Sequence, residues 1–432
     1  MIRLTCRACK AGLSTVFCDL GSTPLANRFL RADQLKEPEP HFPLCTYVCE
    51  SCWLVQLPAH EQPAAIFSDY AYFSSYSSSW LAHARDYADM AVTRFGLDSS
   101  SRVVEVASND GYLLQYFARR GVPVFGIEPA KNVASVAREK GVPTESIFLG
   151  ETTARTLVAK FGTAGLLIAN NVLAHVPDIN DFVAGLRVLL AGDGVLTIEF
   201  PHLLELLRNN QFDTIYHEHY SYLSLHSASR VLASHGLRVF DVETLGTHGG
   251  SLRVFVCHDD SVRPTELRVK KLRELEVRAG LQQIETYRRY GTRAARVRED
   301  LRALLRGAAA RGERMAGYGA PAKGNTLLNY CGITPRELPY TVDASPHKQG
   351  LFLPGTHIPI LAPAELLTRK PRAVLILPWN IREEILAVLA PARDWGCRFW
   401  VAVPEVTELR GDVASGGSGD YGEVTQGGAI DL

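Results

Sequence analysis

Residues 103–111 read VVEVASNDG, and residues 124–128 read VFGIE. Each segment begins as a short apolar run of strand length, and the first continues into a turn of small and polar residues. Residues 111–120, between the runs, follow a helical pattern. Strand, helix and strand in this order predict a βαβ unit with parallel strands buried on both faces.

The same alternation continues along the chain and predicts an α/β fold built on a doubly wound sheet. Further apolar runs occupy residues 166–173 and 194–200, with a helical pattern at residues 179–190 between them. Residues 237–245 and 251–257 are separated by Gly249-Gly250, so we expect them to pair as a hairpin. This hairpin would form an antiparallel edge of the sheet.

A second α/β alternation follows a long charged segment, residues 264–311, which is typical of solvated helices. Its predicted strands are residues 314–319, 340–344, 373–379 and 398–404. Residues 68–80 are rich in aromatic residues and serine, and predict a loop leading into a helix at about residues 80–95. The domains that we expect are residues 1–65, 66–260 and 261–410, followed by a disordered tail at residues 411–432 that is rich in Gly and Ser.

The composition of the 432 residues narrows the class of protein. The formal net charge is zero, which disfavours a nucleic-acid binder. No apolar run reaches the roughly 18 residues of a membrane helix, and the start of the chain lacks a long apolar signal segment. We therefore expect a cytoplasmic protein that binds neither nucleic acid nor membrane. The expected partner is a small-molecule substrate, and the expected oligomeric state is a monomer.

Six of the nine cysteines lie within the first 52 residues. Cys6-x-x-Cys9 and Cys49-x-x-Cys52 have the spacing with which paired thiolates hold one tetrahedral zinc ion. Four cysteine ligands leave no position for water, so the predicted zinc is structural. Cys45 remains an alternative ligand, and four unpaired structural cysteines remain the alternative to a metal site.

The first βαβ unit has the features of a nucleotide-type cofactor site. Glu105 lies inside the first strand, and its carboxylate can orient an ammonium group, whereas Glu128 ends the next strand and can accept hydrogen bonds from ribose hydroxyls. The turn lacks the G-x-G of dinucleotide sites, which disfavours NAD. S-adenosylmethionine (SAM) is the predicted cofactor, with Asn170-Asn171 beside its methyl group. A purely structural βαβ unit is the alternative.

Residues 213–220, DTIYHEHY, hold the densest cluster of titratable side chains, and another histidine occurs in residues 173–178, LAHVPD. Carbon attacks a sulfonium methyl group once a base has converted it to an enolate, and histidine has a suitable pKa for that base. Tyrosine or a second histidine can stabilise the enolate oxygen. A metal site at His217 and His219, or a polar surface loop, is the alternative. The aromatic stretch at residues 70–76 is either a lid or a cover on the cysteine-rich segment.

These motifs resemble one family, the C-3 methyltransferases of nucleotide-linked 4-keto-2,6-dideoxyhexoses, which build branched deoxysugars for antibiotics. The resemblance covers nearly the whole chain. It rests on the paired CxxC motifs and on DLGSTPLANRFL (19–30), EVASNDGYLL (105–114), GIEPA (126–130), NNVLAHVPD (170–178), YHEHYSYLS (216–224), HGGSLRVF (248–255) and GYGAPAKGNTLLNY (317–330).

The resemblance implies a zinc-binding N-terminal domain, a central Rossmann-like class I methyltransferase domain and a Rossmann-like C-terminal domain that holds the nucleotide of the sugar. It implies His219 as the base, with Tyr216, Glu218, His175 and the lid residue Tyr70 as further catalytic residues. Its cofactor contacts fall on Glu105, Asn109, Glu128 and Asn171.

The expected substrate contacts are Tyr72, His217, Gly319, Lys323, Asn325 and Lys348. A glycine turn after a strand suits a phosphate, and Lys323 can meet the charge of a diphosphate, with Asp343 and residues 345–348 completing the site. A second α/β layer without a ligand is the alternative.

The predicted activity is SAM-dependent C-methylation of a dTDP-linked 4-keto-deoxysugar at C3 through an enolate. Methylation at C5, and O- or N-methylation of a similar sugar, remain alternatives. Two others are a zinc-bearing scaffold with a vestigial cofactor fold and NAD binding in the second α/β domain, which its irregular GYGAPAKGN pattern disfavours.

Overall fold

The computed structural model describes residues 4–61, 74–76 and 78–410. The chain divides into two compact units. Unit 1 comprises residues 1–17, 46–205 and 217–282, and unit 2 comprises residues 18–45, 206–216 and 283–432. The expected lid residues Tyr70 and Tyr72 and the expected tail at residues 411–432 lie outside the described residues.

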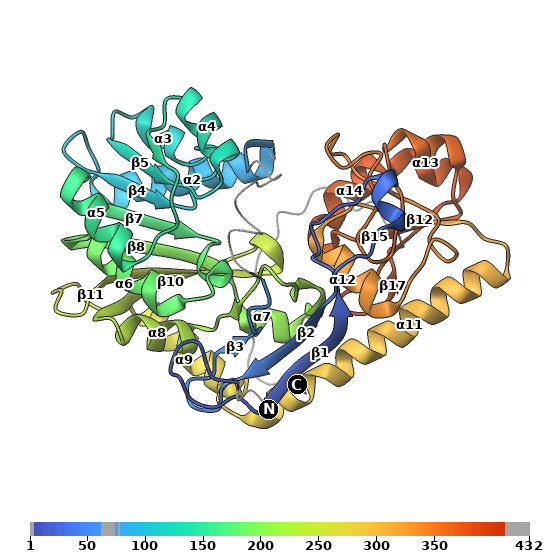
Figure 1. Ribbon diagram of the computed structural model, residues 1–432, viewed down its shortest axis with the longest axis horizontal. Coiled ribbons are helices and arrows are strands. Elements are labelled where there is room, and N and C mark those ends of the chain that lie inside the picture. Colours follow the sequence, from blue (N-terminus) through green and yellow to red (C-terminus); the bar gives the residue numbers. More distant parts are fainter. Residues whose placement is uncertain (1–3, 62–73, 77, 411–432) are drawn as a thin grey trace. The chain divides into compact units, whose positions relative to one another are not determined.

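Unit 1 contains a seven-stranded sheet of order β10-β11-β8-β7-β4-β5-β6, which confirms the predicted α/β class (Figure 1). The strands are β4 (Val103–Val106), β5 (Val124–Ile127), β6 (Thr144–Glu145), β7 (Ala164–Asn170), β8 (Leu190–Pro201), β10 (Leu237–Leu245) and β11 (Ser251–His258). Strands β4 to β8 pair in parallel. The predicted hairpin is present, with β11 antiparallel to β8 and β10 at the edge.

Alternating residues of the central strands enter two different apolar cores. Val104 and Leu167 join the core on one face of the sheet, whereas Val103 and Leu166 join the core on the other. Since both faces are covered, the strands read as continuous apolar runs in the sequence. The covering helices are α2 (Ser78–Phe95), α3 (Leu114–Ala118), α4 (Lys131–Glu139), α5 (Glu151–Phe161), α6 (Ile179–Leu189), α8 (Leu225–Ala233) and α9 (Leu267–Arg278). Helix α7 (Leu203–Arg208) follows β8 in the chain.

A small sheet of order β1-β2-β3-β9 was not predicted from the sequence. Its strands are β1 (Thr15–Thr23), β2 (Phe42–Val48), β3 (Val55–Gln56) and β9 (Ser221–Tyr222). Val55 pairs with Tyr222 and Gln56 with Ser221, so the cysteine-rich segment is joined directly to the segment that follows the histidine motif. Strands β1 and β2 span the boundary between the two units.

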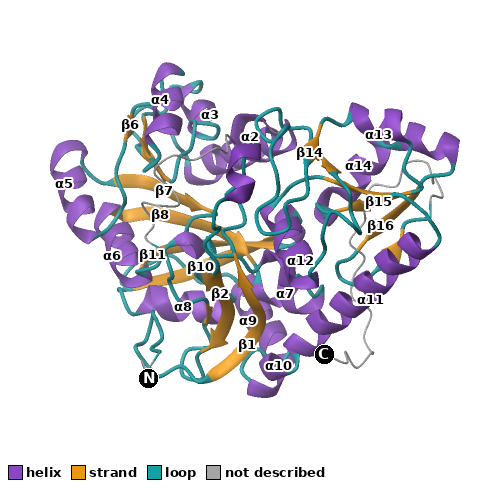
Figure 2. Cartoon of the chain, turned by 45° about the vertical axis from the view of Figure 1, so that its right-hand side comes forward, coloured by secondary structure: helices purple, strands orange, loops and turns teal. Residues whose placement is uncertain are grey.

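Unit 2 contains a six-stranded sheet of order β14-β13-β12-β15-β16-β17. Figure 2 labels its strands β14, β15 and β16. The strands are β12 (Met315–Tyr318), β13 (Thr341–Val342), β14 (Ile360–Leu361), β15 (Ala373–Ile376), β16 (Arg398–Val401) and β17 (Thr407–Glu408). All pairs are parallel except β16 with β17. The helices are α10 (Ile284–Arg288), α11 (Tyr290–Ala310), α12 (Ala322–Cys331), α13 (Ala364–Arg369) and α14 (Arg382–Val388).

Short 3₁₀ helices occur between several of these elements. They are η1 (Ala32–Lys36), η2 (Ser74–Tyr76), η3 (Leu173–His175), η4 (Phe212–Thr214), η5 (Thr247–Gly249), η6 (Trp379–Ile381) and η7 (Ala390–Trp395). Within the described ranges, no helix combines the length and the apolar character of a membrane span.

Candidate active site

The four predicted zinc ligands come together. The Sγ atoms of Cys6, Cys9, Cys49 and Cys52 all lie within 4.8 Å of one another. The hydrogen bond from the Cys52 thiol is the largest cause that lowers the pKa of Cys6, to about 4, and so favours a thiolate. Four sulfur donors at this spacing fit a tetrahedral zinc ion. Cys45 is not part of this group.

The turn after β4 is held in an unusual backbone conformation. Ala107, Asn109 and Gly111 have positive φ angles of 58°, 49° and 75°. Two of these residues are not glycine, and such conformations persist where surrounding contacts impose them. The Asn109 side chain accepts a hydrogen bond from the Ser74 N–H at 2.9 Å. This strained turn explains why α3 begins at Leu114 rather than at the predicted residue 111.

Glu105 points its carboxylate into the interior at this turn. The residue is 1% exposed, and burial raises its pKa well above the ordinary value even though the Tyr112 side chain bonds to it. Its Oε2 atom has no hydrogen-bond partner among the described residues. A buried acceptor of this kind fits an ammonium group such as that of SAM, which would satisfy the carboxylate and restore its charge.

Glu128 is fixed beside the same turn. Its Oε2 accepts the Asn109 N–H at 2.9 Å and its Oε1 accepts the Ala130 N–H at 2.8 Å. Burial nevertheless raises the pKa of this carboxyl group. Each carboxylate oxygen can accept a second hydrogen bond, so the oriented Glu128 fits a pair of ribose hydroxyls.

Asn171 follows the end of β7, the strand next to β4. Its φ angle is 53°, and its N–H donates to the Glu199 carbonyl at 2.7 Å. Neither the Oδ1 nor the Nδ2 atom has a hydrogen-bond partner within the described part of the chain, although both are buried. Such an amide, at the carboxyl edge of adjacent parallel strands, fits a polar ligand group.

Two histidines that are distant in the sequence meet in unit 1. The ring centroids of His175, in η3, and His219 are 4.7 Å apart, with an angle of 66° between the rings. The two loops are joined by a hydrogen bond from the Tyr220 N–H to the Ala174 carbonyl, 2.8 Å long. Burial lowers the pKa of His175 to about 4, so its imidazole is neutral at neutral pH.

The neighbours of His219 in the motif are also buried. Glu218 is 5% exposed and His217 is 4% exposed, and the His217 ring lies 6.3 Å from that of His60. Tyr216 is the last residue of its segment in unit 2.

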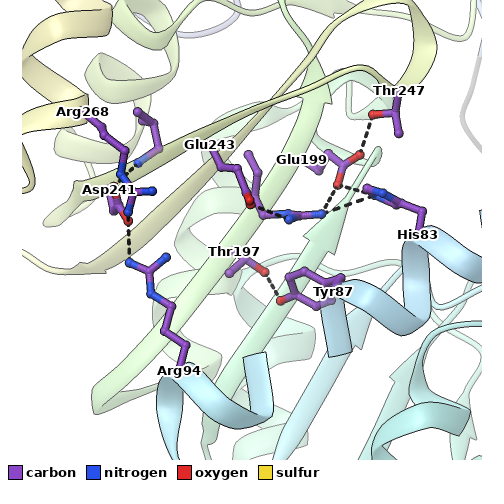
Figure 3. A network of polar contacts seen from close by, with 11 residues as sticks. His83, Tyr87, Arg94, Thr197, Glu199, Asp241, Glu243, Thr247 and Arg268 are labelled. Atoms are coloured by element: carbon purple, nitrogen blue, oxygen red, sulfur yellow. Dashed lines mark hydrogen bonds and ion pairs between the residues drawn. The ribbon is translucent and has the colours of Figure 1, made fainter. Parts of the chain in front are cut away.

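A buried charged network beside this site was missed at the level of sequence (Figure 3). Glu199 in β8 bonds to Arg253 at 2.9 Å, to His83 at 3.1 Å and to the Thr247 hydroxyl at 3.1 Å. Burial raises the pKa of Glu199, but the His83 hydrogen bond and the Arg253 charge more than offset it and lower the pKa to about 2. The network ties α2 and η5 to the centre of the sheet.

An aromatic group extends from this network to Glu105. The Trp80 ring lies 5.0 Å from that of His83, 6.1 Å from that of Tyr112 and 5.2 Å from that of His248. These residues come from three separate segments, so the hydrophobic periodicity of the sequence does not predict that their rings meet. The HGGSLRVF motif, which contains His248 and Arg253, was the available signal.

In unit 2, the predicted phosphate turn precedes α12. Gly319 has a φ of 89°, and a Cβ there would lie 2.6 Å from Cδ of Pro378, so the position requires glycine. Lys348 donates to the Ala320 carbonyl at 2.9 Å, and Asp343 accepts the Ala320 N–H at 2.7 Å.

Lys323 and Asn325 of the same motif are already engaged with protein groups. Lys323 donates to Asn380 at 2.7 Å and lies 4.6 Å from the Trp379 ring centroid. Asn325 is 1% exposed and donates to the Ala26 carbonyl. Trp379 donates to Asp213 at 2.7 Å, and burial raises the pKa of Asp213 to about 6.

Three family models match the chain in succession. They are described as "Putative zinc binding domain" (residues 6–67), "Methyltransferase domain" (residues 80–242) and "C-methyltransferase C-terminal domain" (residues 246–404). With the four-cysteine site and the SAM-type turn, they define a SAM-dependent C-methyltransferase with a zinc-binding domain.

The C-methyltransferase NovU of Streptomyces niveus is 40% identical over 403 residues, which cover 93% of this chain and 95% of that protein. The chain therefore belongs to the C-methyltransferase family that includes NovU.

Solved structures resemble only part of the chain. Magnesium protoporphyrin IX methyltransferase from Synechocystis PCC 6803 with bound SAH is 15% identical, with a TM-score of 0.34, over 41% of this chain and 83% of that one. A SAM-dependent methyltransferase from Anabaena variabilis ATCC 29413 is 12% identical, with a TM-score of 0.34, over 45% of this chain and 87% of that one. Similarity at this level supports no assignment of a substrate or of a residue's role.

Proposed function

We propose that this enzyme methylates C3 of a dTDP-linked 4-keto-deoxysugar, with His219 as the base that removes the C3 proton. The observation that carries the proposal is the buried contact between the His219 and His175 rings, 4.7 Å between centroids. His175 lies four residues beyond Asn171, at the edge of the sheet where β4 and β7 end. The contact with His175 supports a base that lies near the edge of the sheet that carries the proposed cofactor turn.

The chemistry requires a base near the substrate and donors near its ketone. His219 takes the proton from C3, and the electrons of that C–H bond form the enolate of the 4-ketone. When bound, SAM would supply the electrophilic methyl group that this carbon takes up. The proton held on His219 then passes to solvent. Tyr216, Glu218 and His175 stabilise the enolate oxygen or orient the base.

Four residues hold the cofactor in this proposal. Glu105 accepts from its ammonium group through the Oε2 atom that has no partner among the described residues. Glu128 accepts from the ribose hydroxyls, and Asn109 fixes Glu128 through a backbone hydrogen bond of 2.9 Å. Asn171 is the fourth cofactor contact, and its buried amide lies beside the methyl group of the cofactor in this proposal.

The second α/β unit holds the nucleotide in this proposal. The turn at Gly319 leads into α12, a ten-residue helix whose N-terminal N–H groups favour a diphosphate. Lys348 lies beside this turn, and Lys323 adds positive charge within the first turn of the helix. Asn325 supports the helix from its buried side. His217 is a further substrate contact in this proposal.

The domain limits, the compartment and the oligomeric state belong to the same proposal. Residues 1–65 bind zinc, residues 66–260 transfer the methyl group, and residues 261–410 hold the nucleotide sugar. The enzyme acts in the cytoplasm as a monomer, without nucleic acid or membrane. The zero formal net charge supports the absence of nucleic acid as a partner. The four-thiolate site needs reduced cysteines, which supports the cytoplasm.

Solvent exchange tests the position and the mechanism together. The enzyme is incubated in D₂O, without SAM, with a panel of dTDP-linked 4-keto-deoxysugars, and deuterium is located by NMR. We expect exchange at C3, and a C3-methylated product once SAM is added. Exchange and methylation at C5 would instead identify a C5-methyltransferase. Product methylated on oxygen or nitrogen, with no exchange at carbon, would reject the enolate mechanism.

A further inference from the structure

We propose that Arg7, which lies between the zinc ligands Cys6 and Cys9, is a positioning residue for the His175–His219 pair. Its guanidinium group holds together the two loops that carry these histidines. The inference rests on the proposed role of His219 as the base. In this view, the zinc-binding segment helps to position the two histidines for the reaction.

The guanidinium group contacts both loops near the histidines. Its Nη1 donates to the carbonyl of Pro177, two residues after His175, at 2.8 Å. Its Cζ lies 5.4 Å from the ring centroid of Tyr220, the residue after His219. Its Nη2 donates to the carbonyl of Leu57, whose own N–H donates to the Tyr220 carbonyl at 3.0 Å. One side chain thus braces the backbone beside each histidine.

The backbone of Arg7 is itself fixed by the zinc-binding segment. The Arg7 N–H donates to Gln56 Oε1 at 2.8 Å, and Gln56 Nε2 donates to the Sγ of Cys6 at 3.1 Å. Asn180, in the first turn of α6, donates to the carbonyls of Arg7 and Ala8, both at 3.0 Å. The backbone of Arg7 is therefore held by hydrogen bonds that lead to the metal ligand Cys6 and to α6, the helix that follows the His175 loop.

Arginine suits this position better than lysine would. Its planar fork donates in two directions at once and lies over an aromatic ring, whereas an ammonium group is a single point charge. Without the fork, two carbonyl groups in a partly buried region lose their donor. The loops would then relax, and a displacement of about 1 Å at a reacting group can lower a rate by roughly 100-fold.

The test uses the full-length, zinc-loaded enzyme and compares Arg7→Ala and Arg7→Lys with Thr15→Ala. Thr15 lies in the same segment, and its hydroxyl donates to Glu50 at 2.6 Å. The Thr15→Ala substitution therefore removes a local hydrogen bond that does not involve either histidine loop. For each variant we measure zinc content, SAM affinity by calorimetry, the solvent deuterium exchange rate of the substrate without SAM, and kcat. Hydrogen–deuterium exchange of peptides reports the protection of the Tyr220 amide.

We expect Arg7→Ala to keep one zinc ion and a SAM Kd within about twofold, while substrate exchange and kcat fall about 10- to 100-fold. The Tyr220 amide should lose protection, and added guanidinium at millimolar concentration should restore part of the rate. Thr15→Ala should match the wild type in every measurement. Substrate exchange in Arg7→Ala at the wild-type rate would overturn the proposal.

If Arg7→Ala loses its zinc, the Arg7→Lys variant tests the positioning role of the guanidinium group instead. The proposal requires that this variant keep zinc and SAM affinity but exchange the substrate at least about fivefold more slowly than the wild type. A rate equal to that of the wild type would overturn it. Absence of exchange in the wild-type enzyme itself would instead reject the role of His219, which separates failure of the proposed function from failure of this inference.

Discussion

The imidazole rings of His175 and His219 lie edge to face, 4.7 Å between centroids, although 43 residues separate them in the sequence. Burial keeps His175 neutral by lowering its pKa to about 4. A neutral imidazole beside His219 can accept or donate a hydrogen bond without a competing positive charge. In the proposed mechanism, this neutral imidazole is the neighbour of the base His219.

Replacing His219 with Gln should abolish methyl transfer. We expect kcat and solvent exchange of the substrate to fall by about 10³-fold, because the variant lacks a base, while the Kd for SAM stays within about twofold. The exposed His41, replaced in the same way, serves as the control. Exchange at the wild-type rate in the His219 variant would show that another group is the base.

Protonation of His175 should destabilise the fold in acid. Its pKa is about 4 in the folded chain and 6.5 in the reference state, so the unfolded chain binds more protons between these values. The contribution of His175 to the free energy of unfolding therefore has its full value above pH 6.5, and it decreases as the pH falls toward 4. Between pH 7.5 and pH 5 the loss is about 2 kcal/mol.

Urea unfolding of the wild type and of His175→Gln at both pH values isolates this effect. The difference in unfolding free energy between the two proteins should shrink by about 2 kcal/mol at the lower pH. A difference that does not change with pH would contradict the buried, neutral His175.

Replacing Cys52 with Ser should release the zinc ion. Three thiolates and a hydroxyl hold zinc less tightly than four thiolates, and the Sγ atoms of the four ligands lie within 4.8 Å. We expect about one zinc per chain in the wild type and in Cys45→Ser, but little in Cys52→Ser, together with a lower Tm. Elemental analysis by mass spectrometry measures this, and loss of zinc from Cys45→Ser would revise the ligand set.

Replacing Glu128 with Gln should weaken SAM binding. Its carboxylate accepts two backbone N–H groups, and an amide nitrogen cannot accept from either of them. We expect the Kd measured by calorimetry to rise by about 10- to 100-fold, since a hydrogen bond to a charged group contributes roughly 1.5–3 kcal/mol. Glu139→Gln, on the exposed face of α4, should change nothing, and an equal effect there would argue against a specific contact.

Replacing Arg253 with Ala should destabilise unit 1. Its side chain is 4% exposed and pairs with Glu199, whose side chain is fully buried. Removal of one partner leaves an unpaired buried charge, at a cost of about 3–5 kcal/mol in unfolding free energy.

Arg155→Ala removes an exposed pair with Glu151 and should change the unfolding free energy by less than about 1 kcal/mol. Adding Glu199→Gln to the Arg253 variant should recover part of the loss, because the unpaired charge is removed. Equal losses in the Arg253 and Arg155 variants would show that the buried pair contributes little.

The main sheets were predictable because their strands are local and strongly patterned. Segments such as 237–245 became strands with the predicted limits, and the antiparallel hairpin was read from Gly249-Gly250. The β1-β2-β3-β9 sheet was missed because β3 and β9 have two residues each, too few to show an alternation. Its pairing of Val55 with Tyr222 is a contact over a long sequence separation.

By itself, the sequence determined the α/β class, the hairpin, the four zinc ligands and the positions of Glu105 and Glu128, because each depends on short-range spacing or periodicity. Tertiary structure alone decided which distant groups meet, including His175 with His219, Arg7 with Pro177 and Tyr220, and Glu199 with His83 and Arg253. The physical reason is that side-chain patterns record how each segment is buried, whereas the partner of a buried charge or ring depends on how the segments pack.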